Sequence, residues 1–141
     1  MLAQHLLLIL IYLIQPKEFI MVAENNPFHI LIVDDDPVIR RLTRRMLNSL
    51  GYEVIEAENG VDALNRFNEN TDIDLVLSDL KMPKMNGLEL AEEIRQLQRT
   101  SKFILISGAN NSFRQIDEDM YYMQKPYTRE SLGQVITMAL S

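Results

Sequence analysis

From His29 onward, short apolar runs alternate with segments whose apolar residues recur at helical spacing. The short runs have the length of strands, and we predict strands at residues 29–35, 52–57, 73–79, 102–108 and 121–126. The run at 73–79, IDLVLSD, is nearly all apolar, which favours a strand buried on both faces.

The segments between the runs predict helices at residues 37–50, 61–69, 88–98 and 128–140. In the first of them, Asp36 can cap the helix ahead of Pro37, and Gly51 can end it. Strands that alternate with helices form a parallel sheet with helices on both faces. The pattern therefore predicts a doubly wound α/β domain.

Residues 6–14, LLLILIYLI, form an apolar run that precedes this pattern. The run is too short for a bilayer, which takes about 20 residues, and no basic residue precedes Lys17 as a signal peptide would require. Three interpretations stay open: an upstream start with Met21 as the true initiator, a segment that covers a face of the domain or of a partner, and, least favoured, a membrane anchor.

We divide the chain into an apolar N-terminal extension at residues 1–20, a polar lead-in at 21–28 and one domain at 29–141. No linker, repeat or low-complexity tract interrupts residues 21–141, so we expect no attached output domain.

Composition narrows the chemistry. The 141 residues include no cysteine, which excludes disulfides, thiolate metal sites and cysteine nucleophiles. The net charge is -6, which disfavours a protein that binds the phosphates of nucleic acids. With only His5 and His29, a histidine-rich metal site is not expected either, so any chemistry depends on carboxylates, hydroxyls and lysines.

Polar residues follow the predicted strands where those strands end. Asp34 and Asp35 follow the first strand, Asp79 ends the third, Ser107 the fourth, and Lys125 the fifth. In open parallel sheets, ligands bind beyond these carboxyl ends. Carboxylates that lie close together repel one another, and Mg²⁺ would neutralise them. With a lysine and a hydroxyl beside it, such a site would suit a phosphoryl group.

The order and spacing of five segments resemble the receiver domain of two-component response regulators, over about residues 29–140. The segments are ILIVDDDP, EAENGVDAL, DLVLSDLKMPKMNGLEL, ILISGA and YMQKPY. The resemblance implies a flavodoxin-like, five-stranded parallel sheet in the order 2-1-3-4-5. It also implies a stand-alone, cytoplasmic receiver of the chemotaxis type, which signals by a change of conformation.

The resemblance assigns roles to individual residues. Asp79 matches the phosphoacceptor, and Asp34 and Asp35 match the acidic pair that holds Mg²⁺, with Asp79 and the backbone carbonyl of Lys81 as further ligands. Lys125 matches the lysine that pairs with the phosphoryl group.

Further positions match the family's switch. Ser107 matches the hydroxyl that turns toward the phosphoryl group, and Tyr122 matches the aromatic residue that reports the phosphorylated state. Ser107, Gly108 and Lys125 would together bind the phosphoryl group, and Gly108, which has no side chain, would leave the site open to a donor. The bond between Lys125 and Pro126 is expected to be cis.

The resemblance also implies partners. A histidine kinase or a histidine phosphotransfer protein would donate the phosphoryl group, an unidentified protein would receive the signal, and neither nucleic acid nor a membrane is expected as a partner. The domain would not be an enzyme beyond slow removal of its own phosphoryl group. The basic face of the first helix, formed by Arg40, Arg41, Arg44 and Arg45, is either a solvated face or the surface that docks a kinase.

The segment 108–124 departs from the family pattern. It is shorter than in chemotaxis-type receivers, its helical pattern is weak, and Asp117, Glu118 and Asp119 interrupt it. We therefore expect the family's fourth helix to be short, displaced or mobile.

Two rival functions stay open. A receiver-fold module that binds proteins without phosphorylation is the first. A Mg²⁺-dependent phosphohydrolase is the second, although Asp34-Asp35-Asp36-Pro37 does not supply the D-x-D-x-[TV] stretch of that class.

Overall fold

A computed structural model describes residues 28–97, 100–108 and 114–141. The apolar run at 6–14 and the possible start at Met21 lie outside the described residues. The strands are β1 (His29–Val33), β2 (Glu53–Ala57), β3 (Ile73–Asp79), β4 (Lys102–Ser107), β5 (Arg114–Gln115) and β6 (Met120–Gln124). The helices are α3 (Pro37–Ser49), α4 (Gly60–Glu69), α5 (Gly87–Gln96) and α6 (Arg129–Leu140).

The strands form one sheet in the order β2-β1-β3-β4-β6-β5. Every pairing is parallel except that of β5 with β6. The doubly wound α/β fold is therefore confirmed, and β2-β1-β3-β4-β6 reproduces the expected order 2-1-3-4-5. The prediction of five strands was wrong by one, because β5 adds a short antiparallel strand at the edge.

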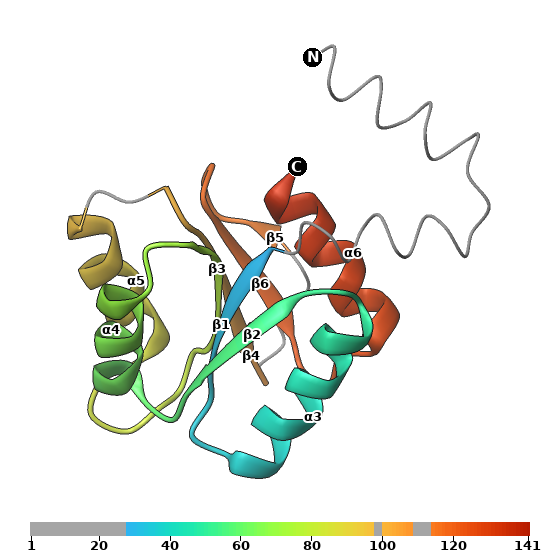
Figure 1. The fold of residues 1–141 in the computed structure, drawn as a ribbon, viewed down its shortest axis with the longest axis horizontal. Coiled ribbons are helices and arrows are strands. Elements are labelled where there is room, and N and C mark those ends of the chain that lie inside the picture. Colours follow the sequence, from blue (N-terminus) through green and yellow to red (C-terminus); the bar gives the residue numbers. More distant parts are fainter. Residues whose placement is uncertain (1–27, 98–99, 109–113) are drawn as a thin grey trace.

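Helices cover both faces of the sheet, α3 and α6 on one side and α4 and α5 on the other (Figure 1). Alternate residues of each strand point to opposite faces. In β1, Ile30 and Ile32 pack with the core of α3 and α6, whereas Leu31 and Val33 pack with the core of α4 and α5. If β1 shifted by one residue along its neighbours, these two sets of side chains would exchange faces. The alternation of side chains therefore fixes the register of the strand, and with it the position at which the strand ends.

Local capping starts the helices at the places that the sequence indicates. The Asp36 side chain accepts hydrogen bonds from the backbone N–H groups of Val38 and Ile39, which confirms its predicted role. Reciprocal capping boxes begin α5 at Asn86 and α6 at Thr128. None of the described helices is long and apolar enough to cross a membrane.

The family's fourth helix is absent from the described part of the segment between β4 and β6. Residues 109–113 lie outside the description, and Arg114 and Gln115 form β5. The turn to β6 closes where the Asp117 carboxylate accepts a hydrogen bond from the Asp119 N–H at 2.9 Å. The acidic residues that interrupt the helical pattern thus take part in a hairpin.

Candidate functional site

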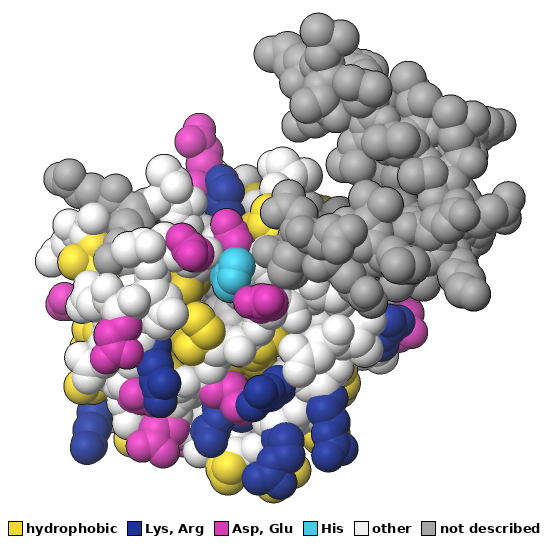
Figure 2. Space-filling model, in the orientation of Figure 1, with side chains coloured by type: hydrophobic (Ala, Val, Ile, Leu, Met, Phe, Trp, Pro, Cys, Tyr) yellow, Lys and Arg dark blue, Asp and Glu magenta, His cyan; other side chains and the backbone are white. Residues whose placement is uncertain are grey.

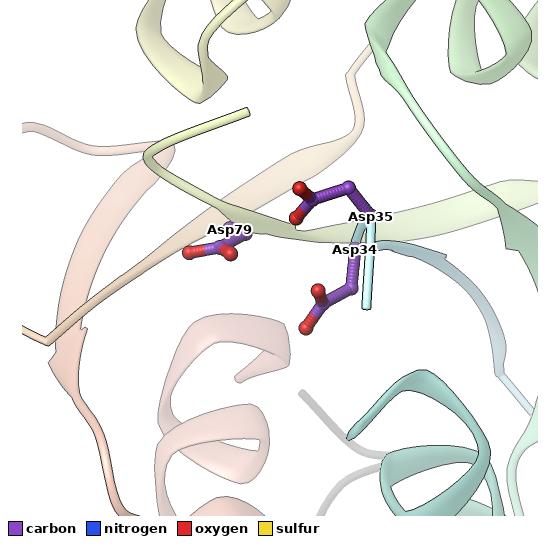
Figure 3. Close-up of side chains that lie close together, drawn as sticks. All are labelled: Asp34, Asp35 and Asp79. Carbon is purple, nitrogen blue, oxygen red and sulfur yellow. The ribbon is translucent and has the colours of Figure 1, made fainter. Parts of the chain in front are cut away.

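Three carboxylates meet where β1 and β3 end. Asp34 and Asp35 directly follow β1, and Asp79 is the last residue of the neighbouring β3. One oxygen of each carboxylate lies within 4.8 Å of the others. In Figure 3, the carboxylates of Asp34 and Asp35 point to the side where Asp79 lies. The grouping predicted from the strand ends is present.

Lys125 brings a positive charge to the same place. Its Nζ lies 3.2 Å from Asp79 Oδ2 and 3.8 Å from Asp34 Oδ2. Burial alone would lower the pKa of Lys125, but the carboxylates of Asp79 and Asp34 raise it above the ordinary value. The lysine is therefore a fixed cation at neutral pH.

The backbone around Lys125 holds it in position. The Lys125 N–H donates to the Ser107 carbonyl at 2.8 Å, which ties the end of β6 to the end of β4. The peptide bond between Lys125 and Pro126 is cis, as the resemblance implied. The hydrogen bond places Lys125 at the edge of the sheet where β4 also ends.

Asp34 is the most deeply buried of the three acids, with 5% of its surface exposed. Burial raises its pKa, although a hydrogen bond from the Asp36 N–H and the charge of Lys125 act in the opposite direction. The Arg40 side chain donates to the Asp34 carbonyl at 2.7 Å and fixes the backbone there. The site thus holds acidic charge at an energetic cost that a bound cation would offset.

The remaining predicted residues lie at or just beyond the ends of β3, β4 and β6. Ser107 ends β4 and is 3% exposed. Gly108 beside it is exposed, and a Cβ added there would meet open space within 4 Å. Lys81 lies in the exposed loop two residues beyond Asp79. Pro126 is exposed at the turn that follows Lys125.

Tyr122 lies apart from the acids, on β6. It is half-buried against the core that includes α4 and α5, and the Arg114 guanidinium carbon lies 5.0 Å from the centre of its ring. The sequence singled out Tyr122 but not Arg114, because a two-residue strand leaves no periodic pattern.

Sequence reasoning also missed Thr43 and Tyr127. Their hydroxyl groups are hydrogen-bonded although the residues are 84 positions apart. Thr43 is buried on α3, and Tyr127 follows Pro126, so the contact joins the Lys125 turn to α3. The only signal in the sequence is the tyrosine in YMQKPY.

The basic face of α3 lines a groove of about 380 Å³ beside the site. In Figure 2, basic side chains gather at the lower edge of the molecule, where Figure 1 places α3. Glu56 forms ion pairs with Arg40 at 3.5 Å and Arg44 at 2.7 Å. Among the described residues, Arg41 and Arg45 have no ion pair, so the face is only partly neutralised.

Comparison with known proteins identifies the arrangement. The family model described as the response regulator receiver domain matches residues 30–137. The chain is 40% identical over 121 residues to the sensor histidine kinase RcsC of Escherichia coli, a match that spans 83% of this chain but 13% of RcsC. It is also 31% identical over 128 residues to the chemotaxis protein CheY1 of Helicobacter pylori, a match that spans 79% of this chain and 95% of CheY1.

A solved structure agrees with these matches. The response regulator TrrA from Thermotoga maritima, in complex with Mg²⁺–BeF, is 35% identical and has a TM-score of 0.70. That comparison covers 80% of this chain and 99% of TrrA.

Proposed function

The chain belongs to the response regulator receiver domain family, and from this premise we propose that it accepts a phosphoryl group on Asp79. The observation that carries the proposal is the position of Asp79, which lies within 3.2 Å of the Lys125 ammonium and beside Asp34 and Asp35. This arrangement combines a nucleophile, a cation and a cluster of metal-binding oxygens.

In the proposed reaction, an oxygen of the Asp79 carboxylate attacks the phosphorus of a phosphohistidine in line with the bond to the imidazole nitrogen. The P–N bond breaks, its electron pair stays on the imidazole, and Asp79 becomes a mixed anhydride. Lys125 stabilises the negative charge on the phosphoryl oxygens, and the Ser107 hydroxyl donates to one of them. Water later attacks the phosphorus, the bond between phosphorus and the Asp79 oxygen breaks, and inorganic phosphate leaves the restored carboxylate.

The oxygen atoms of Asp34, Asp35 and Asp79 fit Mg²⁺, which prefers carboxylate ligands and retains several waters. We include the Lys81 backbone carbonyl as a fourth ligand. When bound, the ion supplies positive charge that offsets both the carboxylates and the incoming phosphoryl group. The Mg²⁺–BeF complex of TrrA supports this part of the proposal.

We propose a histidine kinase or a histidine phosphotransfer protein as the donor, because the relatives include a sensor histidine kinase. The partly neutralised arginines of α3 lie beside the acceptor edge and suit an acidic docking surface on the donor. Gly108 leaves open space for its approach.

We propose that the chain is a stand-alone, cytoplasmic receiver that signals to another protein through Ser107 and Tyr122. The match that spans 95% of CheY1 supports this organisation. The match to 13% of RcsC supports the alternative, in which the receiver is one domain of a larger kinase. In either setting the domain acts as a signalling module, with at most slow loss of its own phosphoryl group.

The second candidate is a receiver-fold module that binds its partner without phosphorylation. Its support is the hairpin that occupies the described part of the segment where the family has its fourth helix. Against it, Asp79 and Lys125 retain the contact that phosphorylation would use.

Intact-mass measurement of the full chain, incubated with acetyl phosphate and Mg²⁺, tests the proposal. We expect one phosphoryl adduct in the wild type and none in Asp79→Asn or after chelation of Mg²⁺. A folded protein that binds Mg²⁺ but gains no adduct would refute the acceptor role and favour the phosphorylation-independent module. Turnover of many small phosphate esters would instead indicate a hydrolase.

A further inference from the structure

Three residues from neighbouring strands form a row across the sheet. Tyr122 of β6 lies opposite Leu105 of β4 on one side and Arg114 of β5 on the other. Leu105 and Tyr122 both pack with the core of α4 and α5. The Arg114 guanidinium lies 5.0 Å from the centre of the Tyr122 ring on the side of β5.

Ser107 shares this face of the sheet. It lies two positions after Leu105 on β4, and alternate residues of a strand point to the same face. Since β6 lies between β4 and β5, Tyr122 stands between the strand that ends in Ser107 and the strand that carries Arg114. A ring that moves toward Ser107 must leave Arg114.

The hairpin that carries Arg114 is held in place by other contacts. The Ile116 N–H donates to the Met120 carbonyl at 2.8 Å. Asp117 forms an ion pair with Arg95 of α5, and Asp119 forms one with Lys102 of β4 at 2.8 Å. Arg114 is exposed, but the hairpin that follows it is tied to α5 and to β4.

We propose that Arg114 holds the Tyr122 ring beneath it in the unphosphorylated protein and thereby sets the balance of the switch. The inference rests on the proposed phosphorylation of Asp79. When Ser107 turns toward a phosphoryl group, the space that it leaves admits the ring, and the contact with Arg114 is lost. The state of Asp79 is then reported at β5, through the residue directly opposite Tyr122.

The expected size of the effect follows from the contact. A cation over an aromatic ring at a partly exposed site contributes about 0.5–1 kcal/mol, which corresponds to a two- to fivefold change in an equilibrium, given RT of about 0.6 kcal/mol. In the unphosphorylated protein, removal of the Arg114 charge should increase about two- to fivefold the fraction of molecules in which the Tyr122 ring has left β5.

The test uses the full chain labelled with 3-fluorotyrosine and observed by fluorine NMR. Tyr122→Phe assigns the Tyr122 signal, and acetyl phosphate with Mg²⁺ defines its phosphorylated position. Arg114→Gln removes the charge but retains the backbone pairing of β5, Arg114→Lys retains a cation, and Arg41→Gln removes an exposed arginine from α3 as the matched control.

Without the phosphoryl donor, we expect Arg114→Gln to increase the population at the phosphorylated position about two- to fivefold. Arg114→Lys and Arg41→Gln should stay close to the wild type. An unchanged population in Arg114→Gln, or an equal change in Arg41→Gln, would overturn the inference.

The mass of each sample separates the two possible failures. If the phosphoryl adduct forms but the Tyr122 signal is the same in Arg114→Gln as in the wild type, only the role of Arg114 is refuted. The absence of any adduct refutes the proposed function and the switch together.

Discussion

The ammonium of Lys125 lies 3.2 Å from the carboxylate of Asp79, although the two residues are 46 positions apart. The contact joins the ends of β3 and β6 across the intervening β4. Among the described side chains, Lys125 alone forms an ion pair with Asp79. The backbone of Lys125 is hydrogen-bonded to that of Ser107.

Replacement of Lys125 should slow phosphorylation strongly. Lys125→Gln removes the cation that stabilises the phosphoryl oxygens, and loss of one such group reduces a rate by about 100-fold or more. The measurement is the rate of adduct formation with acetyl phosphate at saturating Mg²⁺. Lys102→Gln is the control, because Lys102 also forms an ion pair with an aspartate, Asp119, which is not part of the three-carboxylate cluster. Equal rates in the two variants would contradict the role of Lys125.

The Asp34→Asn substitution should stabilise the metal-free fold and should remove most of the stabilisation that Mg²⁺ gives to the wild type. Because burial raises the pKa of Asp34, its charge destabilises the metal-free fold at neutral pH, so the isosteric amide should raise the melting temperature by about 2–5 °C. Mg²⁺ should stabilise the wild type and have little effect on the variant. Thermal unfolding with and without Mg²⁺ checks both effects, and an equal Mg²⁺ response in the two proteins would exclude Asp34 as a ligand.

Gly87 should tolerate no side chain. A Cβ at this position would lie 2.6 Å from the Asp79 carbonyl oxygen and 2.8 Å from a methyl group of Leu105. We expect Gly87→Ala to destabilise the fold by about 1–3 kcal/mol and to slow phosphorylation, because the backbone of Asp79 must shift.

The matched control is Gly133→Ala in α6, where a Cβ would meet Leu50 at an ordinary 3.5 Å. There, the better helix propensity of alanine should stabilise the fold by about 0.5–1 kcal/mol. Urea unfolding compares the two variants, and a Gly87→Ala protein as stable as the wild type would disprove the close approach.

The hydrogen bond between Thr43 and Tyr127 should stabilise the fold and depend on pH. Tyr127→Phe should cost about 1 kcal/mol, and a double-mutant cycle with Thr43→Val isolates the contact. Burial raises the pKa of Tyr127 above 10.0. Its contribution is therefore complete below pH 10.0 and is lost as the pH rises through the higher pKa of the folded state.

Urea unfolding of the wild type and Tyr127→Phe at neutral and alkaline pH measures this difference. We expect the gap in unfolding free energy between the two proteins to narrow at alkaline pH. A gap that stays constant would show that Tyr127 does not ionise with a raised pKa.

Much of the fold and the acidic cluster could be predicted from local pattern. The alternation of apolar runs and helical repeats determines which element each residue joins, and parallel strands bring their carboxyl ends to one edge. Asp34, Asp79 and Lys125 therefore converge without any knowledge of side-chain packing.

The features that the pattern did not reveal depend on tertiary contacts. β5 contains only Arg114 and Gln115, too few residues for a period, and it forms because β6 offers an unpaired edge. The contact between Thr43 and Tyr127 depends on how α3 packs beside the turn after β6, which spacing along the chain does not specify.

Asp79, and no other carboxylate, should carry the phosphoryl group. The most direct test is to trap the product with borohydride, which reduces an acyl phosphate to an alcohol, and to map the modified residue by peptide mass spectrometry. After treatment with acetyl phosphate and Mg²⁺, we predict homoserine at position 79 and unmodified Asp34 and Asp35. Reduction at another carboxylate, or none at position 79 in folded protein with Mg²⁺ bound, would show that Asp79 is not the phosphoacceptor.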